Sequence, residues 1–131
     1  MTAPQPSLRS PLGRARGLGS AKQGAHHWWV QRLTAVALVP LSLWFIFSLA
    51  GLAGADHAGF TAWLGSPVNA TLLALVAAVS FHHAALGIQV VIEDYVADHG
   101  LRVASIVAVK LACAGLAALS VVSILLVAFG R

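Results

Sequence analysis

The chain has 131 residues, of which 59% are hydrophobic and only 9% charged, with a net charge of +4 and a mean hydropathy of +0.85. Soluble domains carry about 25% charged residues, so this composition excludes a soluble globular domain and predicts an all-α integral membrane protein. The basic residues are too few and too thinly spread to form a nucleic-acid-binding surface. Cys113 is the single cysteine, which excludes an intrachain disulfide and a CxxC metal or redox site.

Residues 1–23 are rich in proline, glycine, serine and arginine and contain no acidic residue. Such a segment cannot bury enough apolar surface to fold alone, so we expect a disordered or extended basic tail ahead of a membrane anchor that occupies residues 24–131. The tail lacks the apolar core of a secretory signal, and no Sec-type cleavage is expected. A retained bacterial cytoplasmic tail is the preferred interpretation, and an organellar transit peptide is the alternative.

Three apolar stretches follow the tail, at about residues 33–53, 68–92 and 103–129. Each reaches the ~20 residues that a helix needs to cross a membrane, which predicts a bundle of three transmembrane helices. Pro40 lies inside the first stretch and is expected to bend it. Pro67 suits the start of the second helix.

The connections and the charges set the topology. Residues 60–64 are a short apolar segment that fits the membrane interface, and residues 98–100 form a tight second connection. Five of the eight basic residues precede the first stretch, and because Lys and Arg stay on the cytoplasmic side, a cytoplasmic amino terminus is predicted. Three spans then bring Arg32 and the Asp94-Tyr95 pair to the same membrane face.

Two adjacent histidines, His82 and His83, lie inside the second apolar stretch. On a helix Asp94 is ~16 Å along the axis from His83, about half of the ~30 Å hydrocarbon core. If Asp94 marks the interface, His83 is near the midplane, where ionisable groups are costly and usually functional. We interpret His83 as an axial haem ligand, with Gly87 one turn later leaving room for a flat macrocycle. The alternatives are that His82 is the ligand, or that the histidine is hydrogen-bonded to a neighbouring helix.

A haem with two imidazole ligands needs a second histidine on the opposite face of the porphyrin. His82 cannot reach around the ring from the adjacent position, and the remaining histidines lie outside the apolar stretches, at His26, His27, His57 and His99. The second ligand is therefore expected to come from another chain. By this interpretation the protein carries half of a haem site.

Polar and aromatic residues near the predicted interface are further candidates. The Tyr95 hydroxyl can donate a hydrogen bond to a quinone carbonyl, and Asp94 can orient it or relay protons; the alternative is an ordinary aromatic belt and helix end. Trp28 and Trp29 are interpreted as interfacial anchors. Arg32 is either a positive-inside residue or a clamp for a haem propionate.

The pattern His83-x3-Gly87-x6-Asp94-Tyr95, which closes the second span, resembles the small hydrophobic membrane-anchor subunit of succinate dehydrogenase, the succinate:quinone oxidoreductase of respiratory chains, or respiratory complex II. A second pattern is similar to the start of that anchor's first helix: Gly24-x-His26-x5-Arg32-x-Thr34. The resemblance covers roughly residues 24–102. The third span matches in placement and hydrophobicity only.

The resemblance implies a set of site residues. His83 matches the family's position for the axial ligand of haem b, although the doubled histidine leaves His82 as the alternative. Tyr95 matches the tyrosine that hydrogen-bonds ubiquinone, with Asp94 beside it. Positions near the haem propionates and the quinone pocket are matched by His26 and Arg32.

The resemblance also implies partners. A large cytochrome b anchor subunit would share the haem, and a flavoprotein and an iron-sulfur subunit would dock on the cytoplasmic face. This chain would be a non-catalytic anchor with no succinate chemistry of its own. Membrane lipids would surround it in the bacterial cytoplasmic (inner) membrane, with the mitochondrial inner membrane as the alternative. Ubiquinone and menaquinone are not distinguished by the sequence.

Two other functions remain open from the residues. One is a small proton- or metal-conducting membrane protein that uses His82 and His83 as relay or ligands. Such a path should continue along one face of a helix through the membrane, but the third span offers few polar side chains, among them Ser105, Lys110 and Ser120. The other is a purely structural membrane-assembly subunit. The anchor is favoured over both.

Overall fold

Three helices of the chain are long and apolar enough to cross a membrane: Ala25–Gly51, Pro67–Tyr95 and His99–Phe129. They are seen in a computed structural model that describes residue 12 and residues 22–130. In this part of the chain there are no strands, and the helices are α2 (Lys22–Gly51), α3 (His57–Leu64), α4 (Pro67–Tyr95) and α5 (His99–Phe129). The prediction of an all-α protein with three membrane spans is confirmed. The predicted tail lies almost entirely outside the described residues.

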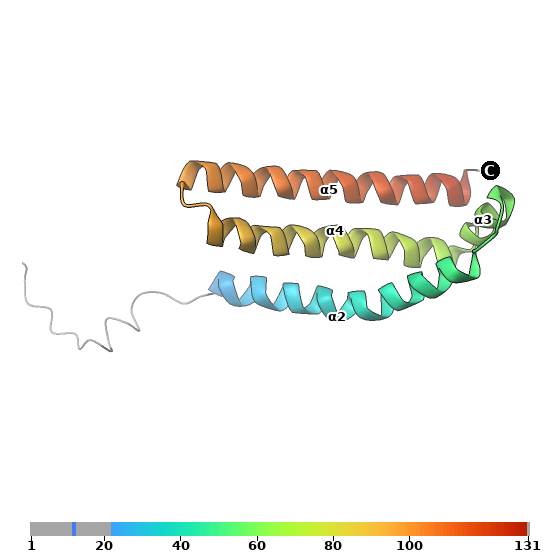
Figure 1. Ribbon diagram of the computed structural model, residues 1–131, viewed down its shortest axis with the longest axis horizontal. Helices are drawn as coiled ribbons and strands as arrows, with labels where there is room; N and C mark the ends of the chain where they lie inside the picture. The colour runs from blue at the N-terminus through green and yellow to red at the C-terminus, as the bar shows by residue number, and fades with distance from the viewer. Residues whose placement is uncertain (1–11, 13–21, 131) are drawn as a thin grey trace, which may run out of the picture.

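The long helices lie side by side in one layer, with α4 in the middle (Figure 1). Within the described residues α4 packs against both α2 and α5, whereas α2 and α5 do not contact each other. A single layer encloses little volume, and the buried hydrophobic residues of this part are Leu64, Ala70, Ala85, Leu86 and Ala128. Most of the apolar surface therefore faces outward, toward lipid or toward other subunits.

The helix α3 closes one end of the layer. Leu64, Ala70 and Ala128 form a buried cluster there, which joins α3, α4 and α5. Trp63 of α3 stacks on Trp44 of α2, with ring centroids 5.9 Å apart and an interplanar angle of 20°. These contacts hold all four described helices together at this end.

The helices extend beyond the apolar stretches that predicted them. The first helix starts at Lys22 rather than near residue 33, because the polar and aromatic residues ahead of the apolar stretch continue the helix. The second starts at Pro67, as predicted. Pro40 lies inside α2, which curves over its second half toward α3 (Figure 1).

The connections are shorter than predicted. His57 and His99 were expected in connections, but each is the first residue of a helix. Asp56 and Asp98 cap these helices: the backbone N–H of Gly59 donates to Asp56 at 2.8 Å, and that of Leu101 donates to Asp98 at 2.7 Å. Such a side-chain acceptor satisfies an otherwise free N–H group and lets the helix begin one residue later.

Candidate functional site

The ring of His83 faces α2. Its Nδ1 lies 2.9 Å from the hydroxyl oxygen of Thr34, and its Nε2 lies 3.5 Å from the side-chain nitrogen of Gln31. All three side chains are half-buried between the two helices. The predicted alternative of a histidine hydrogen-bonded to a neighbouring helix therefore describes this geometry. Haem ligation by His83 stays a prediction.

Gly87 lies one turn after His83 on the same side of α4. A methyl group built on Gly87 would lie 3.5 Å from the Gln31 side-chain nitrogen, an ordinary van der Waals distance. The packing of α2 against α4 would thus tolerate alanine here. Contact with α2 therefore does not by itself require glycine at this position.

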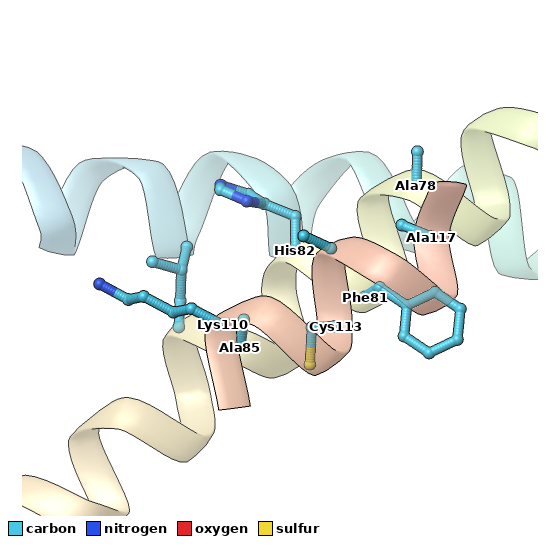
Figure 2. Close-up of a pocket in the computed structure, with 9 residues that line it drawn as sticks. Ala78, Phe81, His82, Ala85, Lys110, Cys113 and Ala117 are labelled. Carbon is cyan, nitrogen blue, oxygen red and sulfur yellow. The ribbon is translucent and has the colours of Figure 1, made fainter. Parts of the chain in front are cut away.

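His82 lies on a different flank of α4. It lines a hollow of about 480 Å³ between α4 and α5, together with Lys110 and Cys113 of α5 and mainly small or apolar residues. Figure 2 shows the His82 ring and the Lys110 side chain extending to the same side of this hollow. The two adjacent histidines thus face different neighbours, because consecutive helix positions differ by about 100° in direction.

A polar stripe on α2 faces α4 and was largely missed by the sequence analysis. Gln31 received no role there, and Thr34 appeared only as part of a pattern. Together with His27, these residues recur at intervals of four and three, which places them on one helix face. Within the described residues, His27 Nε2 and Gln31 Oε1 are buried without a hydrogen-bond partner. Their periodicity inside an apolar helix was the available signal.

Asp94 and Tyr95 end α4, and both are exposed, Tyr95 at 84% of its surface. Among the described residues neither side chain has a hydrogen bond or an ion pair, whereas the adjacent Glu93 accepts a hydrogen bond from Gln89 at 2.6 Å. The structure does not bring this pair into contact with His83. It places their polar groups at the helix end, free to meet a ligand or another chain.

Arg32 and His26 are exposed residues of α2 and do not contact His83. The Arg32 guanidinium carbon lies 4.3 Å from the centroid of the Trp28 ring, a cation–π arrangement. Arg32 also lines a hollow of about 380 Å³ on the surface of α2. Both residues belong to the first half of α2, and α2 begins at the end of the layer where α4 finishes with Asp94 and Tyr95 (Figure 1).

The donor set fits one side of a haem. Within the described residues there is no group of three or more His, Cys, Asp or Glu side chains that could hold a metal ion. A haem iron is held by its porphyrin and needs a single protein ligand on each face. A half-buried imidazole with one nitrogen bonded to a hydroxyl, beside a glycine, meets that requirement, as ligating histidines commonly donate their other N–H to an oxygen.

Comparisons with known proteins identify the family of the chain. Residues 6–127 match the family of succinate dehydrogenase/fumarate reductase transmembrane subunits. The succinate dehydrogenase hydrophobic membrane anchor subunit of Rickettsia bellii is 42% identical over 105 residues, covering 79% of this chain and 83% of the relative. The corresponding subunits of Rickettsia conorii and Paracoccus denitrificans are 37% and 35% identical, covering 81% and 75% of this chain and 85% and 75% of the relatives.

No solved structure matches the chain. The three apolar helices and the bacterial sources of these relatives are consistent with a multi-pass protein of the bacterial inner membrane.

Proposed function

The chain belongs to the family of succinate dehydrogenase/fumarate reductase transmembrane subunits, and we propose that it holds one side of a haem b and forms one wall of a ubiquinone-reduction site. As a membrane anchor of succinate dehydrogenase, it associates with the catalytic subunits and with the membrane. The proposed partners are a large cytochrome b anchor subunit, an iron-sulfur subunit and a flavoprotein subunit. Succinate itself would react on the flavoprotein and not on this chain.

The position of His83 carries the haem proposal. Its ring is half-buried in the contact between two membrane helices, and one ring nitrogen is bonded to Thr34 at 2.9 Å. A neutral imidazole held in this way presents its other nitrogen as a ligand. When bound, the haem supplies an iron that accepts and releases one electron at a time.

The layer leaves room for a second anchor subunit. Large apolar side chains of α2 are exposed along its length, among them Leu33, Val36, Leu43 and Phe47. A single layer with outward-facing apolar surface is completed when another helical subunit covers it. That subunit would supply the second axial histidine, since His82 faces α5 instead.

The exposed end of α4 supports the quinone proposal. Reduction of a quinone to a quinol consumes protons as well as electrons, so the site needs a hydrogen-bond donor and a group that can pass a proton. The phenolic hydroxyl of Tyr95 can donate to a quinone carbonyl, and the Asp94 carboxylate can hold a proton beside it. Arg32 and His26 belong to the first half of α2, which begins at the same end of the layer, and would contact the haem propionates or the rim of the quinone pocket.

The direct test replaces each histidine separately in the assembled complex. We expect His83→Ala to abolish or alter the optical spectrum of a haem with two histidine ligands, because iron loses its ligand from this chain. His82→Ala is the matched control and should leave the spectrum unchanged. A normal spectrum in His83→Ala together with an altered one in His82→Ala would overturn the assignment and move the ligand by one residue.

A further inference from the structure

We infer that Thr34 is a positioning residue for the haem: its hydroxyl fixes the tautomer of His83, so that Nδ1 carries the proton and Nε2 is left as the nitrogen that binds iron. The inference rests on the proposed haem function of His83. It adds a role for a second residue, on another helix.

The hydroxyl of Thr34 has one proton and three close neighbours. Its oxygen lies 2.9 Å from the carbonyl oxygen of Val30, 3.0 Å from that of Gln31, and 2.9 Å from His83 Nδ1. Threonine in a helix commonly donates its proton to a carbonyl of the preceding turn. The lone pairs of the hydroxyl oxygen then remain as acceptors, and the partner at 2.9 Å that can donate to them is the Nδ1–H of His83.

A neutral imidazole has only one N–H group. If Nδ1 carries it, Nε2 has the lone pair. The side-chain nitrogen of Gln31, which is only a donor, lies 3.5 Å from Nε2, in agreement with a lone pair on that atom. This distance is too long for a strong hydrogen bond, so the Gln31 side chain is held only weakly beside Nε2 and would turn aside when Nε2 binds iron.

The arrangement also orients the ring. The polar contact joins α2 to α4 within two membrane-spanning helices, where water is scarce as a substitute partner. A hydrogen bond from Nδ1–H to an oxygen increases the electron donation from Nε2 to a bound metal and fixes the ring plane. Thr34 should therefore influence both how tightly haem binds and how readily the iron is reduced.

The test is made in the purified, assembled complex with Thr34→Val, which keeps the shape of threonine but removes the acceptor. We expect haem affinity to fall by roughly tenfold or more, measured as haem content per complex under dilution. The haem midpoint potential should rise, because a weaker donor stabilises ferric iron less. The g values of the ferric haem in electron paramagnetic resonance should shift as the ring turns.

Two controls separate this effect from a general disturbance of the fold. Thr34→Ser retains a hydroxyl and should restore the potential and the g values. Thr71→Val makes the same chemical change at an exposed position of α4 and should alter nothing. If Thr34→Val prevents assembly, Thr34→Ala removes the same acceptor without adding a methyl group beside the ring.

The outcomes distinguish this inference from the proposed haem function. If Thr34→Val keeps the native haem content, potential and g values while His83→Ala loses the haem signal, Thr34 has no positioning role and the haem assignment stands. If His83→Ala keeps the signal, the haem assignment itself is wrong. A shift in Thr34→Val that Thr34→Ser does not reverse would indicate a packing effect and overturn the inference.

Discussion

At one end of the helical layer, α3 covers the ends of α4 and α5, Leu64 is 2% exposed, and Trp44 stacks on Trp63. At the other end, where α2 begins and α4 finishes, Tyr95 is 84% exposed. We call these the closed end and the open end. At the closed end the side chains of different helices pack against one another, whereas at the open end polar side chains are exposed. The closed end thus joins the helices to one another, and the exposed polar groups of the open end are the ones to which we assign partners and substrate in the proposed function.

The largest expected effect is a loss of stability at the closed end. Leu64→Ala removes a fully buried side chain and should cost about 2–5 kcal/mol in the free energy of unfolding. Thermal unfolding of the detergent-solubilised complex measures this loss. The control Leu126→Ala, at a 66% exposed position of α5, should change stability by less than about 0.5 kcal/mol. Equal losses of stability at both leucines would contradict the expectation that packing at the closed end contributes more to stability than an exposed position.

A smaller but more selective effect is expected at the open end. Tyr95→Phe removes a hydroxyl that we propose donates to the quinone, and a lost hydrogen bond of ~1.4 kcal/mol corresponds to about a tenfold fall in the rate of quinone reduction. Succinate oxidation with artificial electron acceptors should stay near normal, as should thermal stability. A parallel fall in both activities would indicate defective assembly and contradict the role of Tyr95.

The smallest expected effect on stability is at the two capping aspartates, one at each end of the layer. Asp56→Ala and Asp98→Ala should each cost about 1 kcal/mol of stability. Only Asp98→Ala should also raise the KM for quinone, because Asp98 caps the start of α5 three residues after Tyr95. Asparagine caps a helix as well as aspartate does, so Asp98→Asn should restore KM. A raised KM in Asp56→Ala would show that the ends are coupled.

The sequence predicted the three spans because hydropathy alone decides them. It did not predict where the first helix begins, since residues 22–32 are mostly polar or aromatic and lie ahead of the long apolar stretch, yet they continue the helix. It also missed the helical start at His57: only residues 60–64 were noted as a short apolar segment, and the cap from Asp56 extends that segment into a helix.

The candidate site was predicted in part. The spacing of His83 and Asp94 along one helix could be measured from residue numbers, and the different directions of His82 and His83 follow from helix geometry. The contact of His83 with Thr34 depends instead on the position of α2 along the axis of α4. That register is set by distant contacts such as Trp44 on Trp63 and the hydrogen bond from the Asn69 side chain to the Trp63 carbonyl at 2.8 Å, which residue spacing does not reveal.

The absence of contact between α2 and α5 within the described residues affects how the subunit folds and how much of it accumulates in the cell. A subunit built as one layer buries few side chains of its own, so we expect its folding to be completed by association with other chains. For such obligate assemblies, stability depends on the concentration of the partner. Copies made in excess would be removed by membrane proteases, and the amount of this subunit would follow the supply of the chain that covers it.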